Sequence, residues 1–221
     1  LQAIVKINSV NPFLDASAPG ESACAHYVGK LMGDLGMQVS MVEPEPTRTY
    51  VVGVIPGRGN GPKLMLNAHI DTVGTDGLEA PFSAEIRDGK LYGRGAFDMK
   101  GAMIACLAAA KILRDSGQHL AGDLIIAGVA DEEYTSLGTA AVIEQFPVDA
   151  AIVTEPTQLR ICLAHKGFIW YELGTKGTAA HGSRWELGVD ANMRMGRFLA
   201  ELDRIEQSLR EGQRHPLVGP A

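Results

Sequence analysis

The sequence has few aromatic residues, no basic tract and no long apolar run. Aromatic residues make up 6% of the 221 residues, and 20 lysines and arginines face 26 aspartates and glutamates, which gives a formal net charge of −6. A general nucleic-acid binder needs concentrated positive charge, so this balance argues against a nucleic-acid partner. No stretch approaches the roughly 18 to 20 apolar residues that span a bilayer, so we expect no membrane partner.

Cysteine is also scarce. The three cysteines, Cys24, Cys106 and Cys162, are odd in number and far apart, and the last two lie within apolar runs. This pattern favours buried free thiols in a reducing compartment over a disulfide framework. The chain also opens without the basic and apolar segments of a secretory signal. We therefore expect a cytoplasmic protein.

Strand-like and helix-like segments alternate over residues 20–155. Apolar residues at helical spacing predict helices near residues 21–36, 98–114 and 137–145. Short apolar runs predict five strands, which are MQVSMVE, YVVGVIP, KLMLNAHI, DLIIAGVA and DAAIVT. The alternation predicts an α/β fold with a mostly parallel central sheet flanked by helices.

The composition changes near residue 166, where we place a domain boundary. FIWYELGTKG alternates apolar and polar residues, as in a strand with one solvated face, and a long helix is predicted at about 188–211. One strand and one helix cannot close a core. We therefore expect one domain over residues 1–166 and the start of a smaller α+β domain over residues 167–221.

A histidine and an aspartate stand at the end of the predicted strand KLMLNAHI. Residues two apart on an extended chain face the same way, so Asp71 can accept a hydrogen bond from one ring nitrogen of His69. The other ring nitrogen is then oriented to bind a metal ion. For this pair alone, an ordinary strand-end histidine beside a turn is the better interpretation.

Further carboxylates follow at three points. Asp98 opens the predicted helix at 98–114, Glu132 and Glu133 follow the strand DLIIAGVA, and Glu155 follows DAAIVT. Taken singly, each has a plainer role as a helix cap, a solvated acidic turn or the residue before a proline turn. Jointly with His69 they bring an imidazole and several carboxylates to one edge of one sheet, where α/β proteins bind ligands. Zn²⁺ and similar divalent ions accept such ligands.

Five successive segments resemble the motifs of one enzyme family. They are HIDTV, GRGAFDMKG, DEEYTSLG, TEPT and AHGSRWELGVDAN. Together they resemble the zinc metallopeptidase and deacylase family that includes acetylornithine deacetylase, succinyl-diaminopimelate desuccinylase, aminoacylase and glutamate carboxypeptidase. The resemblance implies that residues 1–166 form a zinc-exopeptidase-like, metal-binding catalytic domain without its C-terminal part. It implies that residues 167–221 are part of a lid and dimerisation domain.

The resemblance also implies a chemical role for each candidate residue. It implies two divalent metal ions, zinc or else cobalt or manganese, with a general base and a histidine that polarises the scissile carbonyl. The assigned metal ligands are His69, Asp98 as the bridging carboxylate, Glu133 and Glu155. The remaining assignments are Asp71 as the residue that orients His69, Glu132 as the general base and His181 as the polarising histidine, which comes from the partner subunit in dimeric members.

The implied activity is hydrolysis of the amide bond of small N-acyl amino acids. Glu155, TEPT and HGSRWELGVDAN favour the acetylornithine deacetylase and succinyl-diaminopimelate desuccinylase branch. A carboxypeptidase or dipeptidase of the same family, acting on short peptides, is the alternative. A non-catalytic binding or interaction module is the alternative from another class. Family members suggest a homodimer through the lid domain, although the apolar stripe of the helix at 188–211 by itself favours packing within its own domain.

One family feature is missing from this sequence. Family members carry their last metal-ligating histidine near the C-terminus of a much longer chain. The remaining histidines here, His26, His119, His165 and His215, do not stand in that motif. We therefore expect an incomplete fragment, with little or no activity when residues 1–221 are expressed alone.

Overall fold

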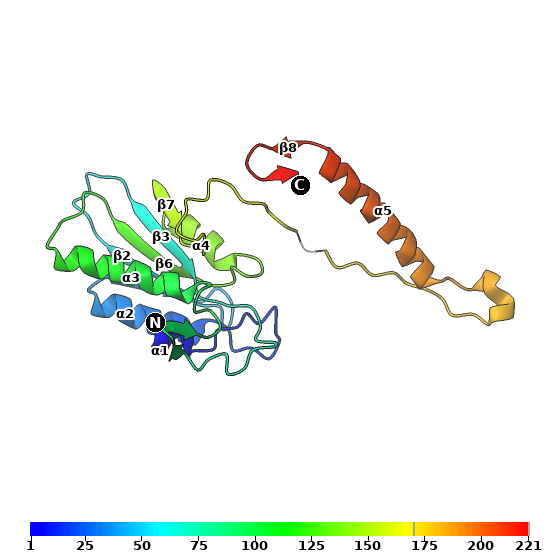
Figure 1. Ribbon diagram of the computed structural model, residues 1–221, viewed down its shortest axis with the longest axis horizontal. Coiled ribbons are helices and arrows are strands. Elements are labelled where there is room, and N and C mark those ends of the chain that lie inside the picture. The colour runs from blue at the N-terminus through cyan, green and yellow to red at the C-terminus, as the bar shows by residue number, and fades with distance from the viewer. Residues whose placement is uncertain (170, 221) are drawn as a thin grey trace. The chain divides into compact units, whose positions relative to one another are not determined.

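The structure is a computed structural model that describes residues 1–169 and 171–220 (Figure 1). It divides into two compact units, Leu1–Leu159 and Arg160–Ala221. The catalytic and lid roles of the two parts stay predictions. Within the described ranges, no helix combines the length and the apolar character needed to cross a membrane.

The first unit is built on a five-stranded mixed sheet with strand order β1-β2-β6-β3-β7. The strands are β1 (Gln38–Val42), β2 (Tyr50–Ile55), β3 (Leu64–His69), β6 (Leu124–Val129) and β7 (Ala150–Val153). β3 pairs in parallel with β6 and β7, whereas β2 pairs antiparallel with β1 and β6. The predicted α/β fold is confirmed, and its parallel part brings the carboxyl ends of β3, β6 and β7 to one edge.

Helices cover both faces of this sheet (Figure 1). They are α1 (Gln2–Val5), α2 (Ser22–Asp34), α3 (Lys100–Asp115) and α4 (Leu137–Gln145). Ile126 belongs to the buried cluster that α2 and α3 form with one face of the sheet, and Ile125 to the cluster that contains Val142 of α4. Because neighbouring strand residues point to opposite faces, one continuous apolar run in β6 serves both clusters. The sequence predicted the three longer helices, α2, α3 and α4, within a few residues of their observed bounds.

The first turn of α4 lies directly against the end of β6. A Cβ atom on Gly138 would lie 2.5 Å from the backbone N and O of Ala130. The amide of Gly138 also donates a hydrogen bond to the carbonyl of Ala130 at 3.0 Å. Only glycine permits this close approach. The contact holds the first turn of α4 against the end of β6, and so holds together the two ends of the loop that connects them.

Some elements differ from the sequence-based prediction. A two-stranded hairpin of β4 (Glu85–Arg87) and β5 (Lys90–Tyr92) forms in the polar segment for which no element was predicted. The three cysteines, all among the described residues, are free, but Cys162 is exposed rather than buried. It lies on extended chain beyond the first unit, so its apolar neighbours do not enter that core.

The second unit contains a short helix η1 (Gly182–Leu187), the long helix α5 (Ala191–Glu211) and a hairpin of β8 (Arg214–His215) and β9 (Gly219–Pro220). Asp190 caps α5 by accepting a hydrogen bond from the amide of Met193 at 3.0 Å. The packing predicted for the apolar stripe of this helix within its own domain is absent, because α5, all of whose residues are described, has no buried residue. Among its described residues, this unit has only the two-stranded sheet of β8 and β9. That sheet is too small for the apolar stripe of α5 to pack against.

The strand predicted at 168–177 is also absent from residues 168–169 and 171–177. Trp170, in the same segment, lies outside the described residues. Alternation of apolar and polar residues supplies one face for a strand, but a ladder also requires a second strand.

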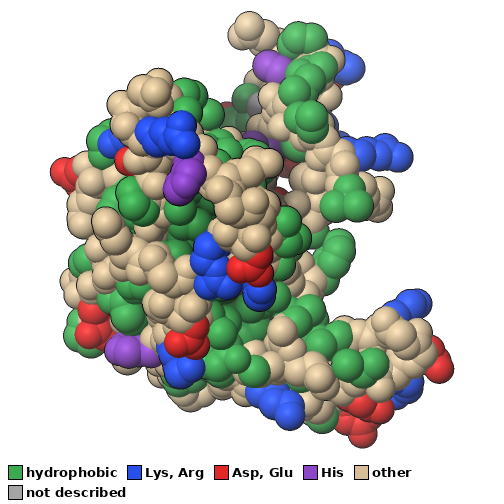
Figure 2. Space-filling model, turned by 90° about the vertical axis from the view of Figure 1, so that its left-hand side faces the viewer, with side chains coloured by type: hydrophobic (Ala, Val, Ile, Leu, Met, Phe, Trp, Pro, Cys, Tyr) green, Lys and Arg blue, Asp and Glu red, His purple; other side chains and the backbone are tan. Residues whose placement is uncertain are grey.

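Charged side chains of both signs are mixed on one face of the molecule. On the face shown in Figure 2, Lys and Arg side chains lie among Asp and Glu side chains rather than in one large patch of a single sign.

Candidate metal centre

His69 is the last residue of β3, and its imidazole is buried with 1% of its surface exposed. Nδ1 lies 3.0 Å from the main-chain carbonyl oxygen of Asp71, which can only accept, so Nδ1 carries a proton. Nε2 lies 3.0 Å from Oδ1 of Asp98. One ring nitrogen is therefore fixed by the chain itself, while the other faces carboxylates. This is the orientation of a metal-ligating imidazole.

Two further carboxylates lie close to the same nitrogen. Nε2 of His69 is 3.8 Å from Oε1 of Glu155 and 3.9 Å from Oε2 of Glu132. His69, Asp98 and Glu155 each offer one ligand atom, and these atoms all lie within 4.8 Å of one another. An imidazole with two carboxylates is a donor set that Zn²⁺ accepts, so the residues present fit a divalent ion.

Asp98 lies immediately before α3 but does not cap it. The N-cap residue of α3 is Met99, and no side-chain hydrogen bond caps this helix. The carboxylate of Asp98 is instead directed to His69, and its side chain remains 53% exposed. The plainer interpretation of Asp98 as a helix cap is therefore wrong.

The acidic loop after β6 is attached to Asp71 through its main chain. The amides of Glu132 and Glu133 donate hydrogen bonds to Oδ1 and Oδ2 of Asp71, each at 3.1 Å. Among the described residues, the three-ligand cluster does not include Glu133. Burial, reinforced by the charges of Asp71 and Asp98 and opposed by His69, raises the pKa of Glu133 to about 7. Glu133 is therefore affected by the negative charges that also surround His69.

The charges of this cluster perturb one another strongly. Burial lowers the pKa of His69, but the hydrogen bond with Asp98 and the charges of Asp71 and Glu132 outweigh it and raise the pKa to about 9. The hydrogen bond from His69 lowers the pKa of Asp98. Burial raises the pKa of Glu132 and of Glu155. Clustered carboxylates resist ionisation unless positive charge relieves them, and a divalent cation is suited to do so.

Asp71 orients His69 in a different way from the one predicted. Its Oδ1 lies 3.6 Å from Nδ1, beyond hydrogen-bond range, and its main-chain carbonyl accepts the ring proton instead. Its carboxylate is already engaged by the two loop amides and by the side chain of Asn11 at 2.9 Å.

Sequence reasoning missed two buried residues behind the cluster, Asn11 and Arg48. Asn11 is fully buried, and Arg48 is 3% exposed and donates a hydrogen bond to the Asn11 side chain at 2.9 Å. Neither residue stands in a motif or at a predicted strand end.

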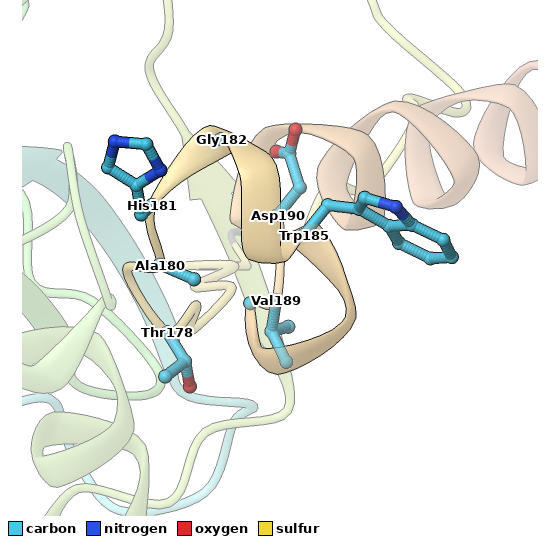
Figure 3. Close-up of a pocket in the computed structure, with 8 residues that line it drawn as sticks. Thr178, Ala180, His181, Gly182, Trp185, Val189 and Asp190 are labelled. Atoms are coloured by element: carbon cyan, nitrogen blue, oxygen red, sulfur yellow. The ribbon is translucent and has the colours of Figure 1, made fainter.

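His181 belongs to the second unit, where it precedes η1. With Thr178, Trp185 and Asp190 it lines an open hollow of about 480 Å³. Figure 3 shows the imidazole and the indole of Trp185 extending outward on different sides of η1. Nδ1 of His181 accepts a hydrogen bond from the amide of Ser183 at 3.2 Å, so the ring proton of the neutral imidazole is on Nε2. The role of His181 at a carbonyl group stays a prediction.

Comparison with known proteins adds independent findings. The family model described as peptidase family M20/M25/M40 matches residues 65–211. An acetylornithine deacetylase from Pectobacterium carotovorum is 34% identical, over 98% of this chain and 57% of its own length. An N-formyl-4-amino-5-aminomethyl-2-methylpyrimidine deformylase from Halalkalibacterium halodurans is 30% identical, over 94% of this chain and 52% of its own. The chain thus spans about half the length of the curated relatives it matches.

Solved structures agree on the fold. A tripeptidase from Staphylococcus aureus superimposes with a TM-score of 0.62 at 17% identity, covering 90% of this chain and 54% of its own. The M20 family metallo-carboxypeptidase Sso-CP2 from Sulfolobus solfataricus gives a TM-score of 0.60 at 24% identity, covering 69% of this chain and 36% of its own.

Proposed function

The chain belongs to peptidase family M20/M25/M40, a family of hydrolases, and from this premise we propose that it carries the metal-binding part of an amide hydrolase acting on N-acyl amino acids. Family membership was predicted from the five motifs. Two relatives at 30% identity or more are named for removing an acetyl or a formyl group. These names support deacylation over cleavage of peptides, since the peptidases among the solved structures are under 25% identical and bear on the fold alone.

The observation that carries the proposal is the meeting of His69, Asp98 and Glu155 at one sheet edge. They arrive there from the end of β3, the start of α3 and the end of β7. We propose that these residues, with Glu133, would hold two divalent ions, and that Asp98 would serve as a ligand shared by both. Zinc is the proposed metal, with cobalt or manganese as alternatives. Bound ions of this kind supply Lewis acidity that polarises a carbonyl group and acidifies water.

Glu132 is proposed as the general base. It lies beside the cluster, with Oε2 3.9 Å from Nε2 of His69, and its loop is fixed to Asp71 by main-chain hydrogen bonds. Burial raises the pKa of Glu132 above its ordinary value, which makes the carboxylate a stronger base. Glu132 would take the proton of the attacking water and deliver it to the leaving amine.

His181 is proposed to stabilise the developing charge on the carbonyl oxygen. Its Nδ1 accepts from the amide of Ser183, so Nε2 is the donor nitrogen. A donor of this kind acts in the transition state, where negative charge collects on the oxygen.

The substrate class is tested on the full product of the gene, loaded with Zn²⁺ or Co²⁺. The assay compares kcat/KM for N-acetylornithine, N-succinyl-diaminopimelate and simple dipeptides. We expect an N-acyl amino acid to be the best substrate. A preference for dipeptides would support the peptidase alternative, and a protein that neither binds metal nor hydrolyses an amide would support the non-catalytic binding module.

We also propose a cytoplasmic homodimer that associates through the second unit. Phe198, Leu202 and Ile205 recur at helical spacing along α5, and each is exposed. Light scattering of the full gene product, with Leu202→Glu as the matched variant, tests this. A monomeric wild type would overturn the dimer.

A further inference from the structure

A short N-terminal segment lies beside the chain that follows His69. Val10 forms a parallel bridge with Thr72. The amide of Asn11 donates to the carbonyl of Thr72 at 2.9 Å, and the amide of Thr72 donates to the carbonyl of Ser9 at 3.1 Å. This segment therefore forms an isolated β-bridge with the chain that follows β3, next to Asp71.

Asn11 joins two loops of the centre through a single amide group. Its Nδ2 donates to Oδ2 of Asp71 and to Oδ1 of Asp131, both at 2.9 Å. Asp71 follows β3 and Asp131 follows β6. Both N–H groups of the side-chain amide are thus used, one on each loop.

Arg48 fixes the orientation of that amide. Its Nη1 donates to Oδ1 of Asn11 at 2.9 Å, and its Nη2 donates to Oδ1 of Asp131 at 2.5 Å. Nη2 also lies 2.9 Å from Oε1 of Glu21, which is fully buried. Because arginine only donates, it holds the oxygen of Asn11 on its own side and directs the NH₂ group to the two aspartates.

The segment that this network holds carries two of the candidate site residues. Asp131 has a φ of 62°, in the left-handed region that non-glycine residues seldom adopt, and the next two residues are Glu132 and Glu133. Their amides return to Asp71, whose carbonyl holds the ring of His69. The hydrogen bonds therefore form one continuous network, which connects Arg48 and Asn11 to Asp71 and to the loop that begins at Asp131.

We propose that Asn11 and Arg48 are positioning residues of the metal centre. Acting through Asp71 and Asp131, they set the angle between the loop that presents His69 and the loop that presents Glu132 and Glu133. The role rests on the proposed function, because it presupposes that ions bind at this site. Partners of this kind behind metal ligands typically change metal affinity by about 10- to 100-fold when they are removed.

The test uses Co²⁺ as the probe, on the full gene product stripped of metal. Arg48→Lys keeps the positive charge but loses the planar fork, and Asn11→Ala removes the link without changing any charge. We expect both variants to bind Co²⁺ about 10- to 100-fold more weakly by calorimetry, with altered visible absorption bands of the bound ion. Arg114→Lys is the matched control, because Arg114 forms a similar but exposed pair with Asp115 on α3, and it should bind like the wild type.

Each result decides a separate question. A wild type that binds no Co²⁺ overturns the metal centre and the positioning role with it. A wild type that binds Co²⁺, with variants that match it in affinity and absorption, overturns the positioning role alone. A lower melting temperature with unchanged absorption bands of the bound ion also overturns it, because a merely stabilising contact would act in that way. Asn11→Ala keeps the test decisive if Arg48→Lys fails to fold.

Discussion

Glu21 offers a sharp test of the buried network, since its charge state is coupled to folding. Its side chain is fully buried, and among the described residues Oε2 has no hydrogen-bond partner. Burial, reinforced by the charge of Asp71 and opposed by Arg48, raises the pKa of Glu21 to about 8. Glu21 is therefore predicted to hold its proton at neutral pH. Glu21→Gln mimics this protonated state at every pH.

The direction of the pH effect follows from the two states. The folded protein keeps the proton of Glu21 up to about pH 8, whereas the unfolded chain releases it near 4.5. Unfolding between these values releases a proton, so the contribution of Glu21 to stability is complete below pH 4.5 and is lost as the pH rises toward 8. At about 1.4 kcal/mol per pH unit, the loss is at most about 5 kcal/mol over this window.

The assay is urea unfolding at pH 5, 6, 7 and 8, with a chelator present so that metal binding does not contribute. The free energy of unfolding of Glu21→Gln should rise relative to the wild type with each step in pH. Glu144→Gln, at an exposed position of α4, is the control and should remain parallel to the wild type. If Glu21→Gln also stays parallel to the wild type from pH 5 to pH 8, Glu21 is ionised in the folded protein and the reasoning is wrong.

Four further predictions concern the proposed base, the core and two glycines. Glu132→Gln should lower kcat by about 10²- to 10⁴-fold while bound metal, measured by elemental analysis, stays the same. Ile126→Ala, in a fully buried position, should lower the free energy of unfolding by about 2–5 kcal/mol in urea titrations, whereas Ile143→Ala, at a 60% exposed position, should change it by less than about 0.5 kcal/mol. Gly138→Ala should cost about 1–3 kcal/mol because its Cβ would meet backbone at 2.5 Å. Gly33→Ala, where a Cβ meets nothing within 4 Å in α2, should instead stabilise by about 0.5–1 kcal/mol.

The fold was predictable where local pattern decides the structure. The apolar run of β6 and the spacing of Met103, Leu107 and Ala110 in α3 identify a buried strand and a one-sided helix. The antiparallel β1–β2 edge could not be derived in the same way, because pairing depends on which strands meet in space. The second unit shows the opposite failure. Alternating residues at 168–177 satisfy the local pattern, yet no strand forms over the described part of that segment.

The site divides along the same line. His69, Asp98 and Glu155 are adjacent to predicted strands or helices, so their chemistry and their placement are both visible in the sequence. Asn11 and Arg48 have no such signal. Their hydrogen-bond partners are distant in the sequence. Asn11 and Asp71 are 60 residues apart, and Arg48 and Asn11 are 37 residues apart. A polar residue in a loop is ordinarily solvated, and only the fold shows that these two are buried.

The parallel arrangement of β3 between β6 and β7 also has a consequence for biosynthesis. The three clustered side chains occupy positions 69, 98 and 155, and Glu155 is brought to His69 by the pairing of β7 with β3. Pairings between segments so distant along the chain form late, because their loop-closure entropy must be met first. A polypeptide still emerging from the ribosome would therefore present a lone histidine and separate acids, and an ion at the proposed metal centre would bind only after this region is translated.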